Sequence, residues 1–397
     1  MTVLLRGAAQ VLRFPEEGLP YLRHDRAGQL TLEPGDVELA GADVEIDATG
    51  CAVLPGLVDC HTHLPFAGWR AEEYERKVTG VPYEEIARLG GGIAASARAL
   101  AAASDDDVLA QAEGLAAELL QHGTTAFEGK TGYGLSRDGE ARAARLGRQL
   151  AARVVQPMRL TGLFAHAVPP GFTADGWMDE AEALARECDV DALDIFVESV
   201  AFGLDQLDRM GAIAADLGLP LRAHVEQLST MRSVPVALRR GARSVDHLSV
   251  IHPDDVGPLA ASETAAVLLP GAELMNAEAT PPARALADAG AICVLATDFN
   301  PGTSPIASLP VIIGLAVRRY GWSVREALLA TTLNAAYVLG WSAELGSLEP
   351  GKRADAIVLD GPAEHIPYRF GHNPVAAVLV AGELAWVRPD QVWRVRA

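Results

Sequence analysis

The stretch that decides the fold is LPGLVDCHTH, residues 54–63, in which an apolar run over residues 54–60 leads straight into two histidines. A continuous apolar run of this length, with Pro and Gly beside it, is typical of a buried strand. Side chains on a strand alternate between its two faces, so His61 and His63 project from the same face. Two neutral imidazoles there can bind a shared metal ion at roughly 2 Å. The His-x-His pair alone is weak evidence for a metal site, because histidines that are merely hydrogen-bonded under a loop can show the same spacing.

Seven further apolar runs follow the first, at residues 124–128, 160–166, 192–198, 220–224, 244–247, 264–269 and 292–297. Helical stretches separate them, most clearly at residues 105–121, 138–153, 204–217 and 305–320. Apolar strands that alternate with helices indicate an α/β protein with a parallel sheet covered on both faces. Eight such units predict a (β/α)8 TIM barrel. A doubly wound open sheet is the alternative, although no GxGxxG motif follows the first strand.

The two ends of the chain differ from this middle part, because Gly and Asp interrupt short apolar runs in both of them. The N-terminal part includes "TVLLRGAAQVLRF", and the C-terminal part includes "GSLEPGKRADAIVLDG" and "PVAAVLVAGELAWV". Short apolar runs between turn residues are typical of strands. We therefore expect residues 1–54 and 346–397 to form one small composite β-sandwich domain, beside a barrel domain of residues 55–345.

The predicted carboxyl ends of the barrel strands concentrate histidine, and active sites of such barrels lie at these ends. His166 ends the third run, His224 the fifth and His247 the sixth, while Asp298 follows the eighth. A carboxylate that touches both a metal and a water can take the water's proton and pass it to a leaving nitrogen, which we expect of Asp298. We expect His247 to polarise the substrate carbonyl or to hold the hydroxide. Hydrogen-bonded structural roles are expected for His24, His122, His252, His365 and His372.

The charge balance argues against several classes of partner. With 33 basic and 52 acidic residues, the net charge is −19, which would repel nucleic acid and anionic membrane lipid. A small anionic substrate remains possible if the pocket supplies its own cation. The four cysteines are widely spaced without a CxxC pair, which suits a reducing compartment. We see neither a signal-peptide h-region nor an uncharged stretch of membrane-spanning length, so we expect a cytoplasmic protein.

Longer motifs resemble those of a known family. "PGLVDCHTH", the strand-5 histidine, "DHL", "ATD" and the terminal "GSLEPGKRADAIVLD" together resemble the amidohydrolase superfamily. Six further segments are similar to the imidazolonepropionase family within it: "FAGWRAEEYERKVTGVPYEEIARLGGGI", "EGKTGYGL", "AHAVPP", "HVEQLS", "LLPGA" and "ATDFNPGTSP". The resemblance spans nearly the whole chain. It implies metal-dependent hydrolysis of the cyclic amide of 4-imidazolone-5-propanoate to N-formimino-L-glutamate, a step of histidine degradation.

The resemblance also implies a set of site residues. In that family three histidines and one aspartate hold one Zn²⁺ or Fe ion, and the matching positions are His61, His63, His224 and Asp298. The family's strand-6 histidine matches His247, and Glu226 of the HVEQ segment is a further candidate for the catalytic chemistry. The family's substrate contacts match Arg70, Tyr83, Tyr133, His166, Gln227 and Asn300. A homodimer is also what the family suggests.

Elementary chemistry agrees with parts of this set. A guanidinium binds a carboxylate bidentately, so Arg70, on the loop after the first strand, suits a propanoate tail; its alternative is a salt bridge to Glu73 or Glu75. Tyr133 lies in a Gly-flanked loop, where its phenol could reach a ligand or pack within the loop. Lys130 could suggest a carbamylated two-metal site, but the family shares this GKxGYG stretch without using the lysine as a ligand. We therefore expect a single metal.

Three segments depart from the family pattern: "TMRSVPVAL" after HVEQLS, "ELMNAEATPPARAL" after LLPGA, and "DHLSV" at the sixth strand. We expect them around the rim of the pocket, where they leave the metal ligands unchanged. A paralogue that acts on a related imidazolone or another cyclic amide is therefore the first alternative. A deaminase of a heterocyclic base on the same scaffold is the second. A metal-binding sensor with a decayed site is a third, and the complete ligand set argues against it.

Overall fold

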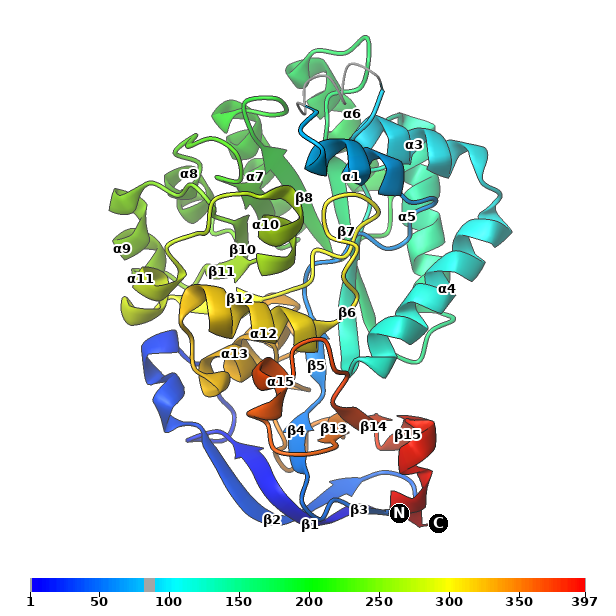
Figure 1. Cartoon of the computed structure of the whole chain (residues 1–397). Helices are drawn as coiled ribbons and strands as arrows, with labels where there is room; N and C mark the ends of the chain where they lie inside the picture. The colour runs from blue at the N-terminus through cyan, green and yellow to red at the C-terminus, as the bar shows by residue number, and fades with distance from the viewer. Residues whose placement is uncertain (1, 82–89, 397) are drawn as a thin grey trace.

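The computed structural model describes residues 2–81 and 90–396, which form two sheets (Figure 1). One sheet has eight strands in sequential order, each parallel to the next. A parallel bridge between Thr62 and Phe299 joins residues just beyond its two end strands, so the sheet curls into a barrel. The predicted (β/α)8 fold class is thereby confirmed. The barrel strands are β5 (Leu57–Asp59), β6 (Thr124–Lys130), β7 (Met158–Ala165), β8 (Ala192–Val197), β9 (Arg222–Val225), β10 (Ser244–His247), β11 (Ala265–Leu268) and β12 (Ile292–Leu295).

The first apolar run serves both sheets, which the sequence analysis did not predict. Its start belongs to β4 (Ala52–Pro55) of the second sheet, and only its later part, β5, belongs to the barrel. Gly56 lies between the two strands, where an added Cβ would be 2.0 Å from Thr125 Oγ1. Only glycine allows the chain to pass so close to β6 while it changes sheets. The expected single strand over residues 54–60 is therefore wrong in its bounds.

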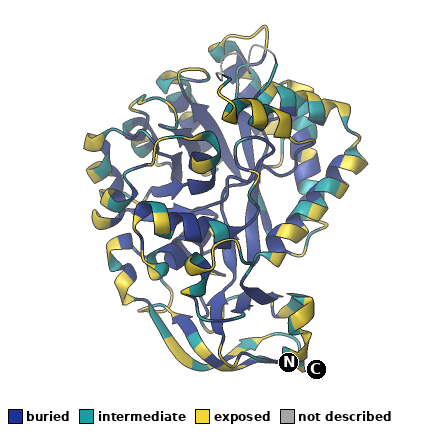
Figure 2. Ribbon diagram, in the orientation of Figure 1, coloured by how far each residue is buried: buried dark blue, intermediate teal, exposed yellow. Residues whose placement is uncertain are grey.

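Helices cover the outside of the barrel, and Figure 2 shows buried strands inside and exposed residues on the outer helix faces. The N-terminus of α4 illustrates why these helices form: Ser104 accepts a hydrogen bond from the backbone N–H of Asp107, and three aspartates occupy the first turn. The described helices of this layer are α1 (Ala71–Val78), α3 (Ile93–Ala102), α4 (Asp105–Gln121), α5 (Arg137–Ala151), α6 (Ala174–Glu187), α7 (Leu204–Leu217), α8 (Val234–Arg239), α9 (Pro253–Ala261), α10 (Pro270–Asn276), α11 (Ala283–Asp288), α12 (Leu309–Tyr320), α13 (Val324–Ala330) and α14 (Leu333–Val338).

The second sheet takes its strands from both ends of the chain, which meet at the bottom of Figure 1. The strand order is β15-β14-β13-β4-β1-β3-β16, with β2 paired to β1. A separate apolar cluster packs this sheet, with Val3, Leu5 and Val53 from one end and Val358 and Leu379 from the other. The new strands are β1 (Thr2–Arg13), β2 (Thr31–Ala40), β3 (Val44–Asp47), β13 (Ala356–Leu359), β14 (Val375–Val380), β15 (Glu383–Val387) and β16 (Val395–Arg396), and the short helices are η1 (His24–Gln29), α15 (His365–Tyr368) and η2 (Pro389–Arg394).

Two features of the described residues bear on the other expectations. None of their helices has the length and apolar character needed to cross a membrane. Two of the histidines expected to be structural are hydrogen-bonded. His372 Nε2 lies 2.7 Å from Asp360 Oδ2, and the His252 side chain caps α9 by accepting from the backbone N–H of Asp254. His24 is different, because both of its buried ring nitrogens have no hydrogen-bond partner among the described residues. It packs instead on Trp322, with 4.2 Å between ring centroids, so the expected hydrogen bonding is wrong for His24.

Candidate active site

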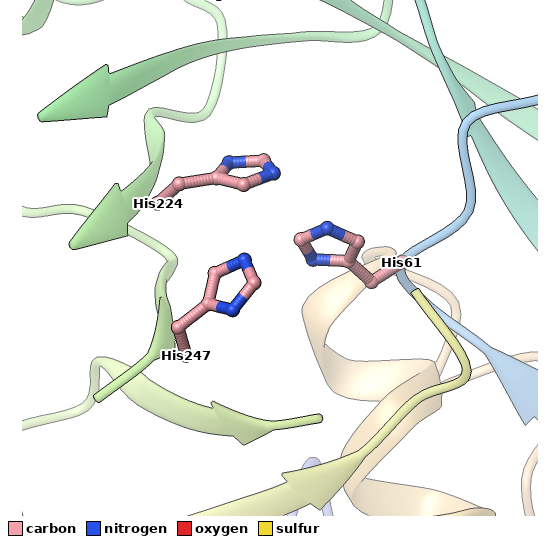
Figure 3. A group of neighbouring side chains, drawn as sticks. All are labelled: His61, His224 and His247. Carbon is pink, nitrogen blue, oxygen red and sulfur yellow. The ribbon is translucent and has the colours of Figure 1, made fainter. Parts of the chain in front are cut away.

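Four side chains with metal-binding atoms meet at the carboxyl ends of the barrel strands. His61 and His63 follow β5, His224 is part of β9, and Asp298 follows β12. The Nε2 atoms of His63 and His61 lie 3.1 and 3.5 Å from the same oxygen, Asp298 Oδ1. The rings of His61 and His224 are 4.5 Å apart between centroids. Figure 3 shows His61, His224 and His247 turned toward one another from different strands.

The atoms of this cluster fit one metal ion. Nε2 of His61, Nε2 of His224 and Oδ1 of Asp298 are buried without a hydrogen-bond partner among the described residues. Buried polar atoms are normally paired, so these three unpartnered atoms suit a ligand that binds them. Burial holds the pKa of His61 and His63 well below the ordinary value, which keeps both imidazoles neutral. Neutral imidazoles with one carboxylate are a donor set that Zn²⁺ and iron accept.

Two carboxylates behind the cluster hold the imidazoles in place. His61 Nδ1 donates to Asp246 Oδ2 at 2.6 Å, and His224 Nδ1 donates to Asp194 Oδ1 at 3.1 Å. A hydrogen bond at Nδ1 fixes the tautomer and the ring orientation, and it leaves Nε2 free for a metal. The free Nε2 of His61 lies 3.5 Å from Asp298 Oδ1. The carboxylates thus prepare the ligands even before an ion binds.

A buried ion network supports those carboxylates. Lys130 Nζ lies 2.7 Å from Asp194 and 2.9 Å from Glu128. Arg222 pairs with Glu128, bonds Asp246 at 2.9 Å and also donates to the carbonyl of Cys60, next to His61, at 2.6 Å. These charged side chains are at most 2% exposed, so each depends on the others for its charge partner. The ammonium of Lys130 is therefore held by carboxylates and does not point to the metal cluster as a ligand.

A cavity of about 300 Å³ opens above the cluster. It is lined by His63, Arg70, Lys77, Ile93, Tyr133, His166, Phe196, Val200, His224, Gln227, Leu228, His247, Asn276, Glu278, Asp298, Asn300 and Thr303. Arg70 is the chief cation of the wall, and its Nε and Nη1 are buried without hydrogen-bond partners among the described residues. The oxygen of Glu73 is 3.9 Å from Arg70 Nε, too far for a hydrogen bond. The guanidinium is thus free to bind an anionic group of a ligand.

Three residues at the ends of the site strands have left-handed backbones. The φ angles are 53° for Glu226, 80° for His247 and 52° for Asp298. Non-glycine residues rarely adopt this conformation, and it costs roughly 1–3 kcal/mol each. Such strain is typical of functional sites, where the surrounding structure holds a side chain in an unusual direction.

The model of the amidohydrolase family matches residues 52–385. The imidazolonepropionase of Rubrobacter xylanophilus is 46% identical over 344 residues, which cover 85% of this chain and 83% of that protein. The imidazolonepropionase of Paracoccus denitrificans is 40% identical over 396 residues, which cover 95% and 98%. The chain belongs to the imidazolonepropionase family. It is a hydrolase that acts on the carbon–nitrogen bond of a cyclic amide.

Solved structures agree with the family at the level of the fold. A triazine hydrolase variant superposes with a TM-score of 0.72 at 17% identity, over 96% of this chain and 94% of that one. An adenosine deaminase from Xanthomonas campestris with bound zinc superposes with a TM-score of 0.66 at 18% identity, over 97% and 93%. At this level of identity the likeness extends to the architecture alone. These two structures therefore do not identify the substrate of this chain, and its own cavity is the relevant feature.

Most residues that the sequence analysis assigned to substrate binding line the cavity above the metal-binding cluster. These are Arg70, Tyr133, His166, Gln227 and Asn300, together with His247 of the catalytic set. The polar atoms of Asn300 are engaged by its own loop: Nδ2 donates to Asp298 O at 2.6 Å, and Oδ1 accepts from Thr303 N at 2.7 Å. Asn300 therefore positions Asp298. Tyr83 lies outside the residues that the structure describes.

Glu226 is placed differently from what we expected. Its carboxylate accepts backbone N–H groups of Met231 at 3.0 Å and of Ser233 at 2.6 Å, and it does not belong to the described cavity wall. The expectation that Glu226 faces the substrate is therefore corrected. The reason is its backbone, because the left-handed φ at Glu226 breaks the strand alternation that would put it beside His224. Gln227 faces the cavity instead.

Sequence reasoning missed four residues that the structure brings to the site. Asp194 is the one charged residue of the otherwise apolar β8, and Arg222 begins the buried β9; a buried charge in such a strand needs a partner. That signal was available, although it does not name the partner. Lys77 and Glu278 line the cavity from α1 and from the loop after α10. No local pattern in the sequence distinguishes them from exposed charges.

Proposed function

We propose that the chain hydrolyses the cyclic amide of 4-imidazolone-5-propanoate and releases N-formimino-L-glutamate, the reaction that the resemblance to the imidazolonepropionase family implies. The observation that carries this proposal is Arg70. Its guanidinium is buried, keeps two nitrogens free of hydrogen-bond partners among the described residues, and lines the same cavity as the metal-binding cluster. A buried guanidinium that no carboxylate of the described residues hydrogen-bonds suits a substrate that carries its own carboxylate. The propanoate tail supplies that group.

The cofactor we propose is a single Zn²⁺ or iron ion held by His61, His63, His224 and Asp298. When bound, such an ion lowers the pKa of a water molecule toward neutrality and polarises a carbonyl oxygen. Several observations support one ion over two. His61 is shared by the two trios of potential ligands, His61–His63–Asp298 and His61–His224–His247. The amine that a carbamylated two-metal centre would need, Lys130, is held in buried ion pairs.

Asp298 and His247 are proposed to handle the proton and the developing negative charge. Asp298 takes the proton of the attacking water and returns it to the departing ring nitrogen, so the carbon–nitrogen bond breaks without release of an anionic amide. Burial lowers the pKa of His247 to about 3, so its imidazole is neutral at physiological pH. A neutral imidazole still has one N–H, which can donate to the carbonyl oxygen as charge develops there.

The walls of the cavity are proposed to orient the substrate. Arg70 binds the propanoate, and the buried phenol of Tyr133, whose pKa burial raises, stays protonated beside it. His166 Nδ1 lies 3.0 Å from the carbonyl of Gly132 and donates to it. Its Nε2 is then an acceptor, because burial lowers the pKa of His166 and keeps the ring neutral. His166 therefore offers the substrate a hydrogen-bond acceptor at Nε2.

A direct assay tests the proposal. The purified protein, loaded with Zn²⁺ or Fe²⁺, is supplied with 4-imidazolone-5-propanoate made in place by urocanase, and N-formimino-L-glutamate is measured. We expect metal-dependent product formation. Absence of turnover in metal-loaded, folded protein would contradict the proposal and would favour a paralogue that acts on another cyclic amide.

A further inference from the structure

The cavity contains a carboxyl group that the proposed mechanism does not use. Glu278 lies in the loop between α10 and α11 and lines the cavity together with His63 and Arg70. Its Oε1 accepts hydrogen bonds from Gln227 Nε2 at 2.9 Å and from Asn276 Nδ2 at 3.0 Å. Its Oε2 is buried and has no hydrogen-bond partner among the described residues. One oxygen is thus fully engaged, and the other is free.

The groups that hold Glu278 are themselves fixed. Asn276 Oδ1 accepts from Lys77 Nζ at 2.6 Å, and the second hydrogen-bond contact of Asn276 Nδ2 is the carbonyl of Thr303 at 3.4 Å. Gln227 follows β9 directly after the strained Glu226. The carboxyl is therefore clamped from α1, from the end of β9 and from α10, with little freedom to turn its free oxygen elsewhere.

The surroundings of the free oxygen favour an N–H donor over solvent. Burial raises the pKa of Glu278 to about 7, Asp298 repels its charge in the same direction, and Lys77 opposes the rise. A buried acceptor without a partner is costly, so a protein that keeps one in its active site gains when a ligand supplies the donor. An N–H group, and still more a cationic one, would satisfy it.

The chemistry of the proposed substrate supplies such donors. Its ring carries an N–H, and hydrolysis adds a proton to the departing nitrogen, so the product ends in a formamidine with further N–H bonds. We propose that Glu278 is a specificity-determining residue that accepts a hydrogen bond from the ring nitrogen edge of the substrate through Oε2, while Gln227 and Asn276 hold Oε1. This inference rests on the proposed function. It assigns the recognition of the two substrate ends to different residues, Arg70 for the carboxylate and Glu278 for the nitrogen edge.

The change Glu278→Gln separates this role from a merely structural one. The variant's amide must keep its oxygen on the donors Gln227 and Asn276, so its NH2 group turns toward the ring N–H. Two donors then face each other, and the hydrogen bond is lost. Loss of one hydrogen bond to a charged group corresponds to about a tenfold to 150-fold weaker interaction. Glu33→Gln on β2 is the matched control, because Glu33 is exposed in the second sheet.

Binding of two ligands to the metal-loaded protein at pH 8 tests the inference. Imidazole-4-propanoate has a ring N–H and the carboxylate, whereas 3-(thiophen-3-yl)propanoate has the carboxylate without an N–H. We expect Glu278→Gln to raise the Kd of the imidazole ligand about tenfold to 150-fold and to leave that of the thiophene ligand within about twofold. Equal changes for both ligands, or no change for either, would overturn the inference. Circular dichroism and metal content confirm that the variant is folded and loaded.

Turnover by the wild-type protein keeps the two proposals distinguishable. If the wild type converts 4-imidazolone-5-propanoate but Glu278→Gln leaves kcat/KM unchanged, the inference about Glu278 fails and the proposed function stands. If the wild type shows no turnover but the two ligands still respond differently to the substitution, the proposed function fails and the N–H acceptor stands.

Discussion

A single methyl group should be able to disable the carboxylate anchor without removing its charge. An alanine Cβ at Gly302 would lie 1.5 Å from Arg70 Nη2 and 1.8 Å from its Cζ and Nε. Ordinary carbon contacts are about 3.5 Å, so the guanidinium must retreat by about 2 Å. Gly302 does not have a left-handed φ, so the alanine backbone itself is unstrained. The effect of Gly302→Ala should therefore come from the displaced guanidinium.

The expected loss follows from the hydrogen bonds that the displacement breaks. A shift of about 2 Å exceeds the tolerance of a hydrogen bond, so one or both bonds of a bidentate pair are lost. Each bond to a charged group contributes about 1.5–3 kcal/mol. We expect kcat/KM of Gly302→Ala for 4-imidazolone-5-propanoate to fall by roughly tenfold, if one bond is lost, to about 10⁴-fold, if two strong bonds are lost, mainly through KM.

Steady-state kinetics on three variants decide the matter. Arg70→Ala should reproduce the loss, because it removes the same anchor outright. Gly257→Ala should leave the kinetics unchanged, because no heavy atom lies within 4 Å of the added Cβ on α9. A folded Gly302→Ala protein with a KM within twofold of the wild type would refute the assignment of Arg70 as the anchor.

Three further outcomes are expected. Asp246→Asn should weaken metal binding about 10- to 100-fold in a chelator competition, because His61 Nδ1 loses its carboxylate partner; wild-type affinity would contradict this. Glu226→Gln should lower the free energy of unfolding by about 1–3 kcal/mol but change kcat/KM only a few-fold, and a catalytic loss without a stability loss would restore its expected catalytic role. Burial lowers the pKa of His24 to about 3, so unfolding takes up a proton below about pH 6.5, and stability falls as the pH drops toward 3. Between pH 6.5 and 4.5, urea denaturation should therefore show His24→Leu losing about 2 kcal/mol less than the wild type, and equal losses would count against it.

The parts of the structure that local patterns encode could be predicted from the sequence. The barrel strands are continuous apolar runs, and the residues that end them, such as His224 and Asp298, necessarily meet at one end of a parallel barrel. The split of the first run at Gly56 could not be predicted, because both halves are apolar and only the contact with β6 separates them. The direction of Glu226 depends on a left-handed backbone that no alternation rule reveals.

A layer of buried charged side chains inside the barrel, which the sequence analysis did not predict, explains why the imidazoles are oriented for a metal. Arg222 precedes His224 by two residues on β9, so both side chains point into the barrel, one layer apart. An aliphatic layer at that depth would avoid the desolvation of buried ions but would leave the Nδ1 atoms of the imidazoles without acceptors. Asp246 and Asp194 supply those acceptors, and Arg222 and Lys130 neutralise them. Lys130 therefore serves the metal site indirectly, because removal of its charge would leave Asp194 without the lysine that neutralises it and would weaken the hold on His224.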